Sequence, residues 1–406
     1  MQKNENFKFE FVALMASLMS IVALSIDALL PALPDIGTYL KVVNENNNQL
    51  LITMIFLGIG IGQIALGPLS DSFGRKPIVY TGFIIFVIAS IICVTSRSFE
   101  IMVIGRVLQG FGLSAPRSLT MSMIRDSYSG NFMAKIMSIV TAFFILIPVI
   151  APTLGTFLTH FFSWKSIFYF NLGFGVIIII WFWLRQPETL PKHKRIKLTS
   201  HLYIDGVNKF FKQKEAVAYT LVSGFITGSF MVYLSTSQQI FEKQYNMGNM
   251  FPYIFASLSI SIGLATFFNS RLVTKFGMFR MGYWSSIAYA LISLLYIALF
   301  WSGTNPNVYI LVSFFAIQFF AVGFLFGNLR ALAMQPLGHI AGIGAAINGF
   351  LSTVIAVPIA NFIGTFVTTS VLPIFIGFSI FGSLSVLTFS LLRRKTFNKK
   401  QIAKSI

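Results

Sequence analysis

The chain has 406 residues, of which 55% are hydrophobic and only 10% are charged. Soluble domains carry roughly 25% charged residues, so this composition excludes an ordinary soluble domain and indicates a membrane protein. The net charge of +18 would suit nucleic-acid binding, but the basic residues gather in alternate loops between apolar segments, as they do on the cytoplasmic side of membrane proteins. We therefore expect the lipid bilayer, and no nucleic acid, as a partner.

Twelve apolar stretches are long enough to cross a bilayer as helices, for which about 20 residues suffice. Strands of a barrel would alternate apolar and polar residues, whereas these stretches are apolar all round. We predict an all-α membrane protein whose twelve spans cover 10–30, 50–69, 77–95, 100–124, 132–157, 164–184, 216–234, 251–269, 282–301, 308–330, 340–366 and 372–392. The even number of spans and the basic loops predict that both termini are cytoplasmic.

Span 1 contains Asp27, which alone among twelve acidic residues lies well inside a predicted span. Pro31 and Pro34 are expected to end the helix shortly after it. A buried carboxylate is costly unless it is paired, hydrated or protonated, so Asp27 is the candidate proton carrier. The alternative is a structural carboxylate near the outer helix end.

The loop between spans 2 and 3, residues 67–76, reads GPLSDSFGRK. Glycine permits a tight turn, the aspartate can cap a helix or pair with an arginine, and the two basic residues hold the cytoplasmic side. We predict a conformational latch whose contacts must break when the protein changes state, formed by Gly67, Asp71, Gly74, Arg75 and Lys76. A turn that only fixes the topology is the alternative.

Span 4 carries Arg106 at about the depth of Asp27, and we predict that the two form a proton-coupling pair. A guanidinium near Asp27 favours the carboxylate, and its departure favours the acid; a static ion pair is the alternative. Gln109 lies one turn from Arg106, and Arg117 lies about three turns away on the same face. Both are predicted to line a substrate cavity, although Arg117 could equally extend towards the cytoplasm.

Span 5 contains Pro148, Pro152 and Gly155. Prolines remove helical hydrogen bonds and kink a helix, and glycine allows close packing. We predict a kinked gate at these residues, with an ordinary transmembrane proline kink as the alternative.

The longest polar segment, 185–215, is basic and leaves six spans on each side. It suits a solvated linker, with a surface helix over 200–212 on the anionic leaflet as the alternative. Residues 269–280 repeat the 67–76 pattern in degenerate form, 203 residues later. We predict two pseudo-symmetric six-helix bundles, at 1–184 and 216–406, joined by a cytoplasmic linker at 185–215.

Phe230 and Tyr233 share a face of span 7 and are predicted to line the substrate cavity, where they can stack on an aromatic ligand. Packing or lipid contact is the alternative. Arg330, near the inner end of span 10, is expected to extend to the cytoplasmic interface. The histidines have no metal-ligand spacing, and no phosphate-binding loop or hydrolase motif occurs, so we expect no metal, no cofactor and no catalytic residues.

The 67–76 loop resembles the signature between helices 2 and 3 of the major facilitator superfamily, G-x-L-x-D-x-x-G-R-[RK]. Residues 106–110, RVLQG, resemble the span-4 signature R-x-x-Q-G, whose arginine is implicated in proton transfer. Residues 151–155, APTLG, resemble a relaxed antiporter signature, in which Ile147, Ala151 and Thr156 replace glycines. Residues 27–34, DALLPALP, resemble the D-x-x-L-P-A-L-P run of the Bcr/CflA drug-resistance subfamily.

The resemblance implies a twelve-helix major facilitator fold and export of drugs by proton antiport across a bacterial inner membrane. We therefore expect a monomer that takes a small-molecule substrate and protons as partners. Three alternatives stay open: export of an endogenous metabolite or siderophore, uptake by proton symport, and a membrane receptor or scaffold that transports nothing.

Overall fold

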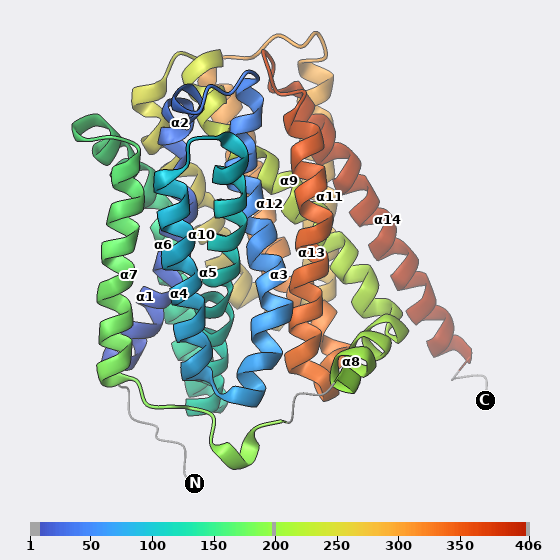
Figure 1. The fold of residues 1–406 in the computed structure, drawn as a ribbon. Helices are drawn as coiled ribbons and strands as arrows, with labels where there is room; N and C mark the ends of the chain where they lie inside the picture. The colour runs from blue at the N-terminus through green and yellow to red at the C-terminus, as the bar shows by residue number, and fades with distance from the viewer. Residues whose placement is uncertain (1–8, 197–199, 403–406) are drawn as a thin grey trace. The chain divides into compact units, whose positions relative to one another are not determined.

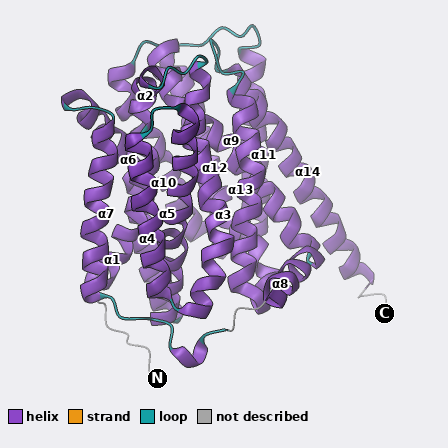
Figure 2. Cartoon of the chain, in the orientation of Figure 1, coloured by secondary structure: helices purple, strands orange, loops and turns teal. Residues whose placement is uncertain are grey.

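The computed structural model describes residues 9–196 and 200–402, and these residues form helices and loops without a strand (Figures 1 and 2). The helices are α1 (Phe9–Asp27), η1 (Leu30–Ala32), α2 (Leu33–Tyr39), η2 (Glu45–Gln49), α3 (Leu50–Phe73), α4 (Arg75–Thr95), α5 (Phe99–Ser127), α6 (Gly130–Phe161), α7 (Lys165–Arg185), η3 (Lys192–Lys194), α8 (Ser200–Lys212), α9 (Lys214–Gln239), η4 (Ile240–Gln244), η5 (Gly248–Met250), α10 (Phe251–Phe276), α11 (Met278–Leu299), α12 (Val308–Met334), η6 (Gln335–Ile340), α13 (Ala341–Gly364) and α14 (Leu372–Ile402).

Eleven segments of the described residues are long and apolar enough to cross a membrane. The twelfth long helix is α5, whose 29 residues extend about 43 Å at the usual helical rise. It is less apolar than the others because it carries Arg106, Gln109 and Arg117. These twelve helices match the twelve predicted spans, so the predicted all-α membrane fold is confirmed.

The first helix, α1, ends at Asp27, just before Pro31 and Pro34, as predicted. Proline lacks an N–H but is tolerated in the first turn of a helix, where the N–H has no partner anyway. Pro31 lies in the first turn of η1 and Pro34 in the first turn of α2. Two short helices, η1 and α2, prolong the apolar segment to Tyr39, so Asp27 is the last residue of α1 and still lies within that segment.

Two compact units can be distinguished, and each is described by itself. Unit 1 comprises Met1–Asp205 and Leu234–Ile260, and unit 2 comprises Gly206–Tyr233 and Ser261–Ile406. In unit 1, α5 packs against α3 and α4, and α1 packs against α6 and α7; in unit 2, α11 packs against α12 and α14. The bundle boundaries at 184 and 216 stay a prediction.

Glycines allow α3 and α5 to pack closely. A Cβ atom on Gly58 would collide with the carbonyl oxygen of Val107, and one on Gly110 would collide with the carbonyl oxygen of Ile55. Small residues are what lets membrane helices approach this closely. The pairing holds α5, and with it Arg106, against α3.

The polar segment between the two sets of spans contains the helix α8, as the surface-helix alternative predicted. In its second half, Gly206 packs against Ile343 and the Phe210 side chain is fully buried. Ile204 and Phe211 stay exposed. The helix is thus anchored by one face, while its other face carries apolar side chains.

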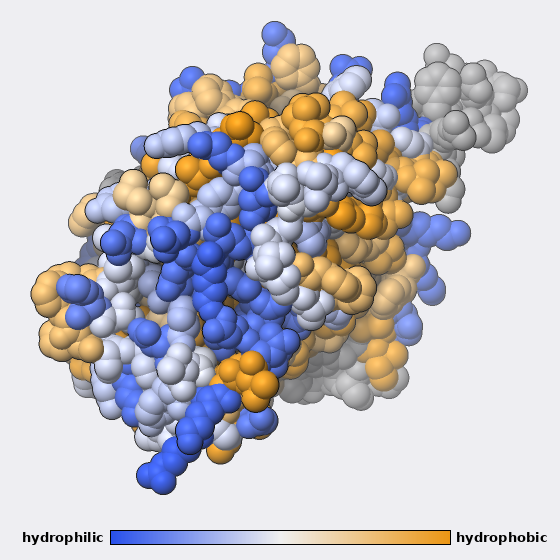
Figure 3. Space-filling view, turned by 90° about the horizontal axis from the view of Figure 1, so that it is seen from above, coloured by the Kyte–Doolittle hydropathy of each residue, from blue (hydrophilic) through white to orange (hydrophobic). Residues whose placement is uncertain are grey.

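The surface changes character along the molecule. Figure 3 looks onto the end that carries α2, and hydrophilic residues gather there. Along α4, in contrast, Ile84, Ile88 and Ile91 are exposed and share one helical face. This arrangement suits lipid around the spans and water at their ends.

We expect Gly110→Ala to destabilise the protein by about 1–3 kcal/mol, the usual cost of overpacking, because the added methyl group collides with the α3 backbone. Thermal unfolding of the purified protein measures this. Gly173→Ala is the matched control, since an added Cβ atom there meets nothing within 4 Å. Equal melting temperatures for the two variants would contradict the packing argument.

Candidate functional site

The predicted latch is a buried ionic cluster around Arg75. Its guanidinium donates from Nε to Asp126 Oδ2 at 2.9 Å and from Nη1 to Asp71 Oδ1 at 2.5 Å. Arg75 is only 3% exposed, so its charge depends on these two carboxylates, since an unpaired buried charge is costly. The cluster joins the α3–α4 loop to the C-terminal end of α5.

Glu188, from the segment after α7, caps the first turn of α4. Its carboxylate accepts the backbone N–H of Arg75 at 3.0 Å and that of Lys76 at 3.1 Å. The N–H groups of a first helical turn have no helical partner, and a negative charge there is also favoured by the helix dipole. Gly74 makes room for this contact, because its φ of +109° suits glycine and a Cβ atom would strike the Glu188 carboxylate.

The remaining latch residues support the same turn. The carbonyl oxygen of Gly67 accepts from Ser70 Oγ at 2.6 Å, and Ser70 Oγ accepts from Arg75 Nη1 at 2.8 Å. Lys76 Nζ donates to the carbonyl oxygen of Trp183 at 3.1 Å. The structure therefore brings all five predicted latch residues together, although their role in a conformational change stays a prediction.

Two residues of this cluster, Asp126 and Glu188, were missed by the sequence analysis. They lie 51 and 113 positions from Arg75, so no local pattern connects them. A signal was available: Asp126 follows directly on Arg125 at the end of span 4, and Glu188 begins the polar segment after span 6. Acidic residues are rare in this chain, and Asp126 and Glu188 both lie next to the loop at residues 67–76.

Arg106 lies fully inside unit 1 and binds carbonyl groups. Its Nε donates to the carbonyl oxygen of Leu51 at 2.8 Å, and its Nη1 donates to the carbonyl oxygen of Ser25 at 3.0 Å and to Gln109 Oε1 at 2.6 Å. The third nitrogen, Nη2, has no hydrogen-bond partner in the described part of the chain. Arg106 and Asp27 form no ion pair in this structure, although Arg106 bonds to the backbone two residues before Asp27.

Asp27, the last residue of α1, is 5% exposed. In the part of the chain that the structure describes, no basic side chain pairs with it. The next residue, Ala28, lies against α6, where a Cβ atom on Gly155 would collide with the Ala28 carbonyl oxygen. The predicted proton carrier is therefore adjacent to the predicted span-5 gate.

The span-5 gate residues lie within one continuous helix, α6. Pro148 and Pro152 are both inside it; Pro152 and Gly155 are buried, and Pro148 is half-buried. Gly155 closely approaches Ala28, the residue that follows α1. Gating at this contact stays a prediction.

Gln109 and Arg117 differ in their surroundings. Gln109 is fully buried and connects Arg106 to α4, since its Nε2 donates to Ser90 Oγ at 2.9 Å. Arg117 is half-buried. Their predicted place in a substrate cavity stays a proposal; in this structure Gln109 binds protein groups.

Phe230 and Tyr233 belong to an aromatic cluster of unit 2 that joins α9 to α12. The Tyr233 ring lies 4.6 Å from that of Phe319 and 4.9 Å from that of Phe315, centroid to centroid. The Phe230 ring lies 5.7 Å from that of Phe326. Tyr233 is buried and Phe230 is half-buried, so the edge of the cluster at Phe230 is accessible.

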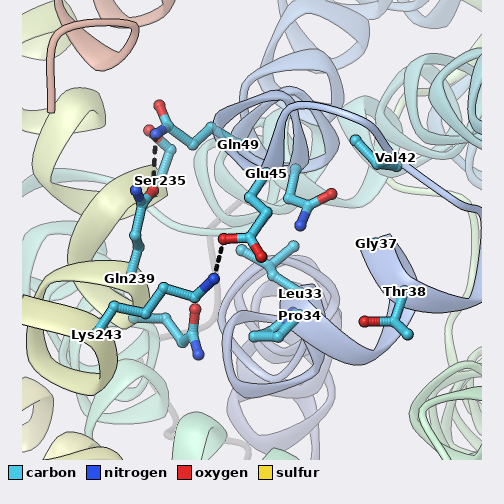
Figure 4. Close-up of a pocket in the computed structure, with 12 residues that line it drawn as sticks. Leu33, Pro34, Gly37, Thr38, Val42, Glu45, Gln49, Ser235, Gln239 and Lys243 are labelled. Carbon is cyan, nitrogen blue, oxygen red and sulfur yellow. Dashed lines mark hydrogen bonds and ion pairs between the residues drawn. The ribbon is translucent and has the colours of Figure 1, made fainter. Parts of the chain in front are cut away.

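A second polar cluster of unit 1 lies at its α2 end (Figure 4). Lys243 forms an ion pair with Glu45. Gln239 donates to Asn46 Oδ1 at 2.7 Å and accepts from Gln49 Nε2 at 3.2 Å. These contacts join η2 to the C-terminal end of α9 and to the π-helix η4, a form that is often found at functional sites.

Two cavities adjoin this α2-end cluster. One of about 90 Å³ lies between Leu33, Gly37, Asn48 and Ser235. The other, of about 600 Å³, is lined by Pro31, Thr156, Thr159 and Glu242 among others. Pro31, which lines the larger cavity, lies four residues after Asp27, but Asp27 itself is not part of the lining. No three His, Cys, Asp or Glu side chains gather as a metal site would require among the described residues.

The twelve spans, the ionic loop and the buried Arg106 define a helical membrane transporter. The sequence pattern of the Major Facilitator Superfamily matches residues 15–360, and the chain belongs to this superfamily. It is thus a multi-pass membrane protein that transports small molecules and is not an enzyme, and the predicted resemblance is confirmed.

The comparisons agree across most of the chain. It is 28% identical to an uncharacterized MFS-type transporter, YdgK, of Bacillus subtilis over 89% of this chain and 90% of that protein. It is 30% identical to a bicyclomycin resistance protein homolog of Haemophilus influenzae over 66% of this chain and 68% of that protein. A crystal structure of a D-xylose–proton symporter superposes with a TM-score of 0.72 at 15% identity, covering 94% of this chain and 96% of that one, which shows the shared fold.

We expect Glu188→Gln to loosen the start of α4, because the charge that caps it is lost. Loss of a cap costs about 0.5–2 kcal/mol, so hydrogen exchange at the amides of Arg75 and Lys76 should quicken roughly 2- to 30-fold. Mass spectrometry of exchanged peptides measures this. Glu100→Gln, in the exposed first turn of α5, is the control; similar exchange in both variants would show that Glu188 is not the cap.

Proposed function

We propose that the protein exports small organic molecules, drugs or drug-like compounds, across the bacterial inner membrane in exchange for protons. It does so by alternating access, as a monomer, with both termini in the cytoplasm. One observation carries this proposal: a buried carboxylate, Asp27, stands inside a membrane span with no basic partner in the described chain.

Such a carboxylate is stable when it is neutral, because a bare charge at this depth is costly. Pro31, four residues after Asp27, lines the larger cavity at the α2 end, and we infer that water reaches the carboxylate from there. Asp27 then takes a proton from the more acidic exterior and gives it up when its surroundings favour the charged form. Neutral and charged Asp27 therefore favour different conformations.

Arg106 changes the electrostatic surroundings of Asp27. Its Nη2 is an unused donor, and its Nη1 already bonds to the Ser25 carbonyl oxygen, two residues from Asp27. A small shift of α1 along α5 brings guanidinium and carboxylate together. This favours ionisation and releases the proton. Gly155, which touches Ala28, places α6 where it follows the same shift.

The two polar clusters of unit 1 suit alternating access. The latch stands at the C-terminal end of α3 and the α2-end cluster at its N-terminal end, about 36 Å away for a helix of 24 residues. Contacts at one end must break while those at the other form. The name of the Haemophilus influenzae relative supports drugs as the cargo.

We expect Asp27→Asn to abolish proton-coupled export, because an amide cannot carry a proton. Cells with the natural protein should tolerate more of at least one compound in a panel of antibiotics and dyes, and cells with the variant should not. Everted vesicles should show proton release on addition of that compound only with Asp27. Asp35→Asn, an exposed carboxylate in α2, should behave as the natural protein, and coupled export by Asp27→Asn would refute the assignment.

We expect Glu45→Lys to speed opening at the α2 end and to lower export modestly. The Glu45 and Lys243 side chains are 63% and 40% exposed. Ion pairs between exposed side chains contribute about 0–1 kcal/mol, which limits the effect to roughly fivefold. Alkylation of a cysteine placed at Ser235 reports opening. The double variant Glu45→Lys, Lys243→Glu should restore both rates, and a larger loss in the double variant would exclude the pair as a gate.

A further inference from the structure

Arg330 of unit 2 is a cation without a counter-ion. It lies within the span α12, it is exposed, and it forms no ion pair with any residue that the structure describes. The sequence makes this a property of the whole unit, because no Asp or Glu occurs after Glu242 and the only acidic residue of unit 2 is Glu215. A charge inside a span ordinarily has a partner, and this chain scarcely offers one.

The angular position of Arg330 shows on which side of α12 it lies. Phe319, Phe326 and Arg330 are spaced by seven and four residues, so they fall within about 40° of one another around the helix. The first two contact α9: the Phe319 ring lies 5.3 Å, and the Phe326 ring 5.7 Å, from the ring of Phe230. Arg330 therefore continues the stripe of α12 that faces the aromatic cluster.

This placement argues against a side chain that only extends to the lipid headgroups, which the sequence favoured. The exposed apolar residues of α12 include Ile317 and Phe320. Arg330 lies between about 80° and 140° around the helix from them. It belongs to the face that packs on protein, and its exposure shows that protein groups no longer cover this face one turn beyond Phe326.

The surroundings define the chemistry of a ligand. Phe230 and Phe326 are half-buried and offer ring faces and edges to an aromatic or apolar body. One turn away, the Arg330 guanidinium offers parallel N–H donors that match a carboxylate. We propose that Arg330, Phe230 and Phe326 form a binding site for small organic anions with an aromatic body, such as aryl carboxylates, and that such anions are among the molecules transported. The transport part rests on the proposed function, while the binding part does not.

Binding is tested with the full-length protein in nanodiscs of zwitterionic lipid, by calorimetry with two probes of the same shape, 2-naphthoate and its neutral amide 2-naphthamide. The natural protein should bind the carboxylate more tightly. Arg330→Gln should weaken carboxylate binding roughly tenfold or more, the usual worth of a hydrogen bond to a charged group, and leave amide binding unchanged. Arg330→Lys keeps the charge but loses the parallel N–H donors of the guanidinium. Its affinity for the carboxylate should therefore lie between those of the natural protein and Arg330→Gln.

Arg280→Gln is the matched control, since it removes an exposed arginine at the start of α11 in the same unit. Equal affinity of the natural protein for the two probes, no binding of either, or the same small loss in Arg330→Gln and Arg280→Gln would each overturn the proposal. Proton-coupled export without selectivity for the carboxylate would refute this site and leave the proposed function standing. Selective binding of the carboxylate without export would support this site and refute the proposed function.

Discussion

The hydrogen bonds of Arg106 are the interaction on which unit 1 depends. A guanidinium that is only 1% exposed is tolerable only if its charge is met by acceptors. The acceptors come from three helices: the carbonyl oxygens of Ser25 in α1 and Leu51 in α3, and Gln109 of α5 itself. The carbonyl of Leu51 belongs to the first turn of α3 and that of Ser25 to the last turn of α1. Arg106 thus fixes how these helices meet beside Asp27.

The charge of Arg75, another buried guanidinium, is stabilised by a different kind of partner. It is neutralised by Asp71 and Asp126, whereas Arg106 is met by uncharged oxygens. Carbonyl groups stabilise a cation without cancelling its charge. The charge of Arg106 is therefore not cancelled by its partners, whereas the charge of Arg75 is neutralised within one compact ionic contact. A contact of this kind can break as a unit, which suits the switch that we propose for the latch.

The sequence predicted much of this architecture because its signals are local. Spans follow from apolar length, and the depth of Asp27 and Arg106 follows from helical rise. Their direct pairing was not found in this structure. Two of the three acceptors of Arg106 are backbone carbonyls, which every residue possesses and no sequence motif marks. The short helices η1 and α2 were not predicted after Pro31 and Pro34, because whether a proline also begins a new helix depends on the neighbouring turn. Glu188 was missed because it contacts Arg75 from a position 113 residues away, which no local pattern reveals.

The internal repeat separates the features that both units share from those found in unit 1 alone. Gly277, the counterpart of Gly74, keeps a positive φ of +81°, but Thr274 and Met278 replace the ionic pair. In the same way, Gln109 donates to Ser90 at 2.9 Å and Gln318 donates to Ser293 at 2.8 Å; yet the residue three positions before the glutamine is Arg106 in α5 and Phe315 in α12. Both units keep the glycine turn and the hydrogen bond from the glutamine side chain to a serine, because backbone geometry and helix packing require them. The charge at this position occurs only in unit 1, which also contains Asp27, and unit 2 has an aromatic ring there instead.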